Sequence, residues 1–183
     1  MCIRDRRYET PLADVLAEAR ATFRFTSPAR HNLCISHRTR VRLNAQCNRH
    51  FAKGKDTVFV RAKAAKGQLC AAQSMFIFQG IELLGCSRNS RKVKNNVLYT
   101  VRQMTEDLVY LSAPHTEELL ALPYAQVAEL LRLSYAQTYA SCQGTEFEGM
   151  LRLHDTQSRF FTRRHLFISL SRAKRAEQID IAC

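Results

Sequence analysis

The sequence predicts an α/β fold that a β-rich segment interrupts. Strand-like and helix-like runs alternate in residues 31–55 and again in residues 123–182, as they do in α/β domains. Between these stretches, residues 75–111 contain short runs of β-branched and aromatic side chains separated by turn residues. Apolar residues make up 46% of the 183, which favours a folded core. We therefore expect an α/β domain with a β insertion.

The first α/β stretch begins with a short apolar strand at residues 33–36. Residues 38–55 follow as a helix-like segment whose charges are all positive, with Val41, Leu43, Cys47 and Phe51 as its possible packing residues. Before this strand, residues 11–25 contain a helix-like stretch that ends at a Thr-Ser-Pro sequence.

The insertion is expected to contain four strands, at residues 75–78, 81–84, 97–101 and 108–111. Gly80, Gly85 and the pair Asn95-Asn96 stand between them at turn positions, and asparagine tolerates the left-handed conformation that tight hairpin turns need.

The second α/β stretch is expected to open with helical character at residues 114–133, with Pro123 at a first helical position. Strands are expected at residues 133–139, 149–153 and 178–182, and a helix at residues 161–172. The apolar face of that helix would contain Leu166, Phe167, Leu170 and Ala173.

Charge and cysteine usage restrict the partners and the compartment. The chain has 28 Lys and Arg against 16 Asp and Glu, a net charge of +12. No apolar run approaches the roughly 20 residues of a membrane span, so the charge favours a nucleic acid rather than a membrane as partner. The cysteines are scattered without a Cys-x-x-Cys pair, which favours a reducing, intracellular compartment but does not separate nucleus, cytoplasm and viral factory.

Histidines and cysteines crowd residues 31–50, where a zinc site would need four of them together. Cys34 falls inside an apolar strand-like run, and the spacing fits no common zinc finger. We expect ordinary core and surface roles for these residues and no metal site.

Two runs in the last third of the chain suggest a nucleotide site. TYASCQGTEF, at residues 138–147, would place Gln143 and Glu146 at the carboxyl end of a strand, with Gly144 allowing close approach or positive φ. LFISLSRA, at residues 166–173, carries Arg172 near the end of a helix. In this order, the two runs resemble motifs V and VI of superfamily 1 helicases of the RecD-like branch.

The resemblance extends to motif IV, which His37-Arg38 and Leu43-Asn44 match, and it spans roughly residues 31–183. It implies a RecA-like (P-loop NTPase-type) second motor domain at residues 31–73 and 115–183, with a small SH3-like β-barrel inserted at residues 74–114. Residues 7–30 would connect it to an absent first motor domain. The opening MCIRDR resembles the translation of a sequencing adapter, and we keep residues 1–6 out of the interpretation of the fold.

The resemblance also implies roles for individual residues. Arg172 would be the catalytic arginine finger at the γ-phosphate of ATP, and Arg38 would contact nucleotide phosphate, although Arg40 is close enough for the register to differ by two. Gln143, Gly144 and Glu146 would line the nucleotide edge. ATP and Mg²⁺ would be bound mainly by the absent domain, since no Gly-x-x-x-x-Gly-Lys-Ser/Thr loop occurs in the chain.

Single-stranded nucleic acid, with DNA as the expected kind, is the implied partner. Its candidate contacts are polar and cationic side chains, namely Thr138, Arg88, Arg91, Lys92 and Lys94. The sequence departs from the family at Ala140-Ser141, where a polar pair usually contacts the strand. The expected function is that of a C-terminal fragment of an ATP-dependent DNA helicase, inactive alone without the phosphate loop. A viral-type RNA helicase and a stand-alone, non-enzymatic nucleic-acid-binding module remain alternatives.

Overall fold

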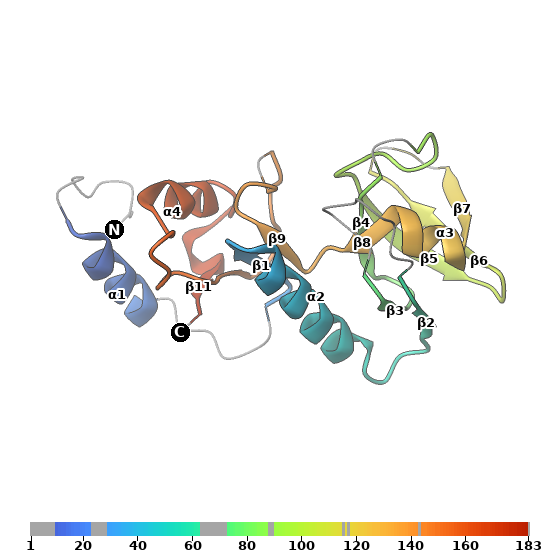
Figure 1. Cartoon of the computed structure of the whole chain (residues 1–183), viewed down its shortest axis with the longest axis horizontal. Helices are drawn as coiled ribbons and strands as arrows, with labels where there is room; N and C mark the ends of the chain where they lie inside the picture. Colours follow the sequence, from blue (N-terminus) through green and yellow to red (C-terminus); the bar gives the residue numbers. More distant parts are fainter. Residues whose placement is uncertain are drawn as a thin grey trace. The chain divides into compact units, whose positions relative to one another are not determined.

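The computed structural model describes residues 10–22, 29–62, 73–87, 90–114, 116, 118–142 and 144–182. The chain divides into two compact units (Figure 1). Unit 1 comprises residues 1–43 and 135–183, and unit 2 comprises residues 44–134. None of the helices in the described parts of the chain is long and apolar enough to cross a membrane.

Unit 1 is built on a four-stranded parallel sheet in the order β11-β10-β1-β9. Its strands are β1 (His31–Cys34), β9 (Ala136–Thr138), β10 (Leu151–Leu153) and β11 (Ile179–Ile181). Unit 1 also contains the helices α1 (Leu12–Thr22) and α4 (Arg163–Leu170), the start of α2 (His37–Ala52) and the 3₁₀ turn η2 (Ala176–Gln178). α1 packs against β11.

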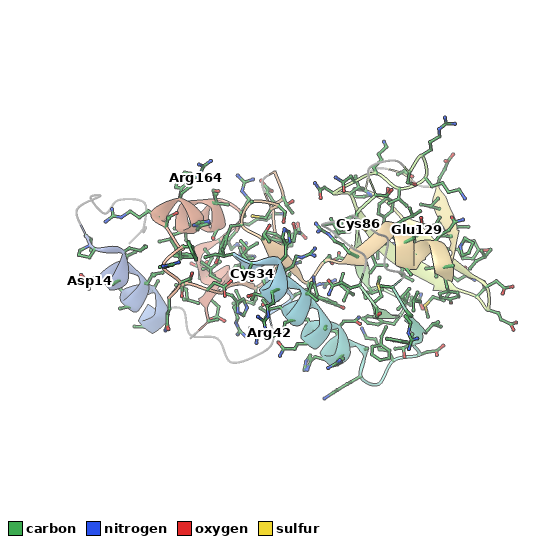
Figure 2. All side chains as sticks on the ribbon, viewed as in Figure 1. Asp14, Cys34, Arg42, Cys86, Glu129 and Arg164 are labelled. Atoms are coloured by element: carbon green, nitrogen blue, oxygen red, sulfur yellow. The ribbon has the colours of Figure 1, made fainter. Side chains whose placement is uncertain are left out.

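The core of unit 1 centres on β1 and β10, the two inner strands, which are apolar and paired on both sides. Leu33, Leu151 and Leu153 are fully buried in the sheet, and they cluster with Leu16 of α1 and Leu166 of α4. The predicted apolar face of α4 is wrong at one position, since Phe167 is 64% exposed. Leu166 and Ser169 are the buried residues of this helix. Figure 2 shows the labelled Arg164 extending away from α4.

Unit 2 contains a five-stranded antiparallel sheet in the order β7-β6-β5-β4-β8. Its strands are β4 (Glu82–Gly85), β5 (Leu98–Met104), β6 (Leu108–Ser112), β7 (Leu119–Pro123) and β8 (Leu131–Leu133). A separate antiparallel pair joins β2 (Val58–Val60) to β3 (Met75–Ile77). The short helix α3 (Tyr124–Leu130) lies between β7 and β8 in the sequence.

The predicted combination of a parallel α/β sheet with an antiparallel β insertion is confirmed, as are the predicted strands of the insertion. The turn before β5 contains Asn96 with φ 59°, as its residue type predicted. The helix predicted over residues 114–133 is wrong at both ends, because β7 pairs with β6 and β8 with β4. Pro123 accordingly precedes α3 as its N-cap. Unit 2 is larger than the predicted insertion, whose functional boundaries stay a prediction.

Candidate nucleotide and nucleic-acid sites

The carboxyl ends of β1, β9 and β10 meet at one edge of the parallel sheet, where open α/β sheets commonly bind ligands. The segments that leave these strands are tied together by hydrogen bonds. Ile35 N donates to Asp155 Oδ2 at 2.9 Å, and Tyr139 N donates to Cys34 O at 3.1 Å. Tyr139 OH donates to His154 O at 2.9 Å. The edge is therefore a fixed frame rather than a set of independent loops.

Arg38 lies in the first turn of α2, at this edge. Ser36 caps the helix, since Thr39 N donates to Ser36 Oγ at 3.0 Å, and the first turn contains no acidic residue. A helix N-terminus attracts anions, and the exposed Arg38 adds a cation there. Arg40, the alternative register, is only 2% exposed. Between the two, exposure favours Arg38 for contact with a phosphate, and that role stays a prediction.

Thr138 ends β9 and is buried. Its hydroxyl donates to Ser141 Oγ at 3.0 Å, and its amide donates to the same oxygen at 3.1 Å. Ser141 N in turn donates to Thr138 Oγ1 at 3.2 Å. Thr138 thus shapes the turn after β9 through its own side chain, and the neighbouring Ala140 is the exposed residue of that turn. A contact of Thr138 with nucleic acid stays a prediction.

The 138–147 run does not stay at the carboxyl edge. Gly144 has φ +83°, the left-handed conformation that its residue type predicted, and a Cβ there would meet no atom within 4 Å. Phe147, near the end of the run, lies beside His31 with ring centroids 5.1 Å apart, and His31 is the first residue of β1. Glu146 therefore lies toward the amino end of β1, contrary to the predicted position, because the loop after β9 turns back. Gln143 lies outside the described residues.

The two motif-like runs are direct neighbours in the structure. Phe147 N donates to Arg172 O at 3.0 Å, and Phe147 forms an isolated parallel bridge with Ala173. Glu148 and Lys174 make an ion pair next to this bridge. The Phe147 side chain is only 4% exposed, so it anchors the contact in the core. The backbone on both sides of Arg172 is thereby fixed. Spacing in the sequence gave no signal for this pairing.

Arg172 follows α4, which ends at Leu170. Its side chain is half-buried, and its Nε donates to Ser171 Oγ at 3.3 Å. Its guanidinium also acts on Cys142, in the 138–147 run. Burial raises the pKa of the Cys142 thiol to about 11, and the positive charge of Arg172 opposes that rise. Arg172 is thus close to the first run as well as bonded to it through the backbone.

The cationic residues of unit 2 lie on the loop between β4 and β5, where Arg91, Lys92 and Lys94 are all exposed. Arg88 lies outside the described residues. Ser90 Oγ accepts from the amide of Lys92 at 3.1 Å, and Lys92 Nζ donates to Gln126 Oε1 at 3.4 Å. The cations are therefore presented by a hydrogen-bonded loop.

The sequence interpretation missed a polar network around β1, an inner strand of the unit 1 sheet. Asn32 Nδ2 donates to Ala29 O at 3.1 Å and to Tyr135 O at 3.0 Å, so its Oδ1 accepts from His154 Nε2, 2.9 Å away. Burial, helped by Arg152, lowers the pKa of His154 to about 4. Within the described ranges, no three His, Cys, Asp or Glu lie together as a metal site. The described cysteines, Cys34, Cys47, Cys86 and Cys142, are buried.

No protein-family model and no curated protein match the chain. Solved structures do match, and helicases are among them. They include Pif1 helicases, of the superfamily 1, RecD-like branch that the sequence motifs resemble.

Three of these structures give the extent of the similarity. A Pif1 structure concerned with unwinding at forked double-stranded DNA has a TM-score of 0.62 at 17% identity, over 93% of this chain and 42% of that one. Bacteroides Pif1 with ADP-AlF3 and single-stranded DNA has a TM-score of 0.58 at 16% identity, over 93% of this chain and 44% of that one. Candida albicans Pif1 has a TM-score of 0.57 at 12% identity, over 92% of this chain and 49% of that one. The shared property is the fold, and the chain spans less than half of each relative.

Proposed function

We propose that this chain forms the second motor domain of an ATP-dependent nucleic-acid helicase that acts on DNA. Unit 1 would be the RecA-like part and unit 2 the SH3-like insertion. The main support is the fold similarity to Pif1 helicases over 93% of the chain, which includes both the parallel sheet and the antiparallel insertion. A fold alone does not define an activity. The match of the motif-like runs adds the chemical argument.

Arg172 is the proposed arginine finger. A planar, permanently charged guanidinium suits the charge that develops on a transferred phosphoryl group. The bridge between Phe147 and Ala173 supports this role, because a finger must be held in place before the transition state forms. Arg38, at the acid-free start of α2, is the second proposed phosphate contact. Gln143 and Gly144 would line the nucleotide edge, whereas Glu146, which lies toward the amino end of β1, is left out of it.

ATP and Mg²⁺, which this function requires, would be held mainly by a first motor domain with a phosphate loop. The residues described here fit a secondary part in binding: Arg38 and Arg172 are cationic donors for phosphate oxygens, and Gly144 leaves open space beside the backbone. Bound ATP would supply the phosphoryl group whose hydrolysis drives domain closure and reopening. Since no phosphate loop occurs in this sequence, we expect the chain alone not to hydrolyse ATP.

The proposed strand contacts are Thr138 in unit 1 and the loop cations of unit 2, namely Arg88, Arg91, Lys92 and Lys94. The net charge of +12 supports a polyanionic partner. Binding through phosphate contacts releases counterions, which makes the affinity depend on salt in a predictable way.

The experiment is a salt titration of binding to fluorescently labelled oligo(dT) and oligo(rU) of equal length, followed by anisotropy. We expect log K to fall with log[salt] by about 0.7 for each phosphate contact. Replacing Arg91, Lys92 and Lys94 together by Gln should make the slope shallower by about 2. Salt-independent binding, or no binding at low salt, would contradict the proposal. Tighter binding of oligo(rU) would favour an RNA helicase instead.

A further inference from the structure

A hollow of about 560 Å³ lies in unit 2, between the β4–β5 loop and the start of β7. Its cationic lining consists of Lys92 and Lys94. Its apolar lining includes Leu98, Pro114 and Leu119, and Leu119 is 49% exposed although it is a large apolar residue. One hollow thus offers positive charge and an open apolar wall together, which a merely solvating loop would not require.

The cationic side of the hollow is rigidly built. Lys94 N donates to Tyr99 OH at 2.9 Å, and Tyr99 is itself buried. A Cβ on Gly85 would lie 2.1 Å from Lys94 O, so the loop approaches β4 as closely as only glycine permits. Val93, between the two lysines, is fully buried. The backbone that carries the lysines is therefore held before any ligand arrives, which lowers the entropic cost of binding.

The two linings match the two parts of a nucleotide. Lysine ammonium groups attract a phosphate, and an exposed leucine and proline offer contact to the face of a base. A second copy of this chain would bring the same net charge of +12 and is disfavoured as occupant. Glu118 also lines the hollow and, among the lining residues that the structure describes, is the acidic one that opposes an anion.

We propose that this hollow holds one nucleotide of a single strand, with its phosphate at Lys92 and Lys94 and its base against Leu119 and Pro114. The proposal rests on the proposed function to the extent that the chain binds a single strand. It adds a contact that depends on the base, which the loop cations alone do not provide.

The test compares oligo(dT) with an abasic phosphodiester of the same length, by anisotropy at fixed salt. Leu119→Ser should weaken the binding of oligo(dT) by about fivefold, from the loss of a half-buried leucine contact. It should change neither the slope of log K against log[salt] nor the affinity for the abasic strand. Phe167→Ser is the matched control, since Phe167 is an exposed apolar residue of unit 1, and it should change neither affinity.

Three further variants test the charge and the wall. Lys94→Gln should make the salt slope shallower by about 0.7 and weaken the binding of oligo(dT) and of the abasic strand equally. Glu118→Gln should tighten the binding of both strands, because it removes the negative charge that opposes the phosphate. Leu119→Phe, which extends the apolar wall, should keep or increase the affinity for oligo(dT), and it preserves the test if Leu119→Ser fails to fold.

The outcomes separate this proposal from the function on which it rests. If the unsubstituted chain shows no salt-dependent binding of a single strand, the proposed function is wrong, and this one with it. If that binding is present but Leu119→Ser binds oligo(dT) as the unsubstituted chain does, only the nucleotide hollow is wrong. The nucleotide hollow would also be wrong if Leu119→Ser lost the same affinity for oligo(dT) and for the abasic strand. It would be wrong as well if Phe167→Ser lost as much affinity for oligo(dT) as Leu119→Ser.

Discussion

At the scale of single residues, Arg172 and Arg175 form a natural pair for comparison. Both follow α4, but only Arg172 lies next to the bridge with Phe147, while Arg175 is exposed and its amide donates to Gln178 Oε1 at 3.1 Å. In a protein that includes the phosphate-loop domain, Arg172→Ala should reduce steady-state ATP turnover on the order of 10³-fold. Single-strand binding should stay nearly unchanged, and Arg172→Lys should rescue poorly because lysine lacks the planar fork.

Arg175→Ala is the control for this experiment and should cost little turnover. Near-normal ATP hydrolysis by Arg172→Ala, or the same loss in both variants, would mean that Arg172 is a surface cation without a catalytic part.

His154 makes the stability of unit 1 depend on pH. Its pKa in the folded chain is about 4, below the ordinary value of 6.5, chiefly because of burial. The unfolded chain therefore takes up the proton first, and the free energy of unfolding should fall as the pH drops from 6.5 to 4. The loss would be on the order of 3 kcal/mol and fully present below pH 4. Urea unfolding at pH 7 and pH 4.5 measures it.

The control for this prediction is His154→Gln, which keeps a donor for Asn32 Oδ1 but does not titrate in this range. Its free energy of unfolding should change less between the two pH values than that of the unsubstituted chain. An identical pH dependence in both proteins would assign the effect to other groups.

Some properties of single residues could be predicted from the sequence and others could not. The positive φ of Gly144 and Asn96 could be anticipated, since it follows from residue types that tolerate this conformation. The position of Glu146 could not, because it depends on how the loop after β9 packs Phe147 against His31. The His154 network could not be predicted either, since its members come from separate strands.

At the scale of elements, the side chain of Asn48 in α2 makes the two backbone hydrogen bonds that a neighbouring strand would otherwise make to β3. Asn48 Nδ2 donates to Phe76 O at 2.9 Å, and Phe76 N donates to Asn48 Oδ1 at 2.8 Å, which pairs the edge of β3. Asn48→Ala would leave both backbone groups without this partner and should lower the free energy of unfolding by about 1–3 kcal/mol. Chemical denaturation measures the change.

Gln46→Ala, an exposed position on the same helix, should shift stability by no more than about 0.5 kcal/mol. Equal effects of the two substitutions would contradict the strand-like role of Asn48.

Elements with a clear period were predicted well, and those that depend on pairing were not. The strands of the insertion were recognisable from β-branched and aromatic runs. Residues 119–123 read as part of a helix, yet they form β7 because β6 offers them a partner. Phe167 fitted the helical period of α4 but is exposed, because this short helix buries only Leu166 and Ser169. Tertiary contacts outweighed local preference in both places.

At the scale of the whole molecule, the sequence predicted the class of fold, which is confirmed, and a polyanionic partner, which stays a prediction. Both came from properties summed over many residues, namely the alternation of strands and helices and the net charge of +12. The boundaries were harder to predict, since unit 2 includes α3, β7 and β8, which lie outside the predicted 74–114 range. The sheet order was not predictable at all, because β1 pairs with strands far away in the sequence.

That sheet order also determines when each unit can form. Strand β1 is synthesised before unit 2, but its neighbours β9 and β10 come only after all of unit 2, and Asn32 bonds to Tyr135 across 103 positions of sequence. Unit 2 is continuous and can close on itself meanwhile. Closing a loop over a folded unit costs less chain entropy than closing it over a disordered one. Folding of unit 2 before β9 and β10 are synthesised would therefore lower the entropic cost of pairing them with β1.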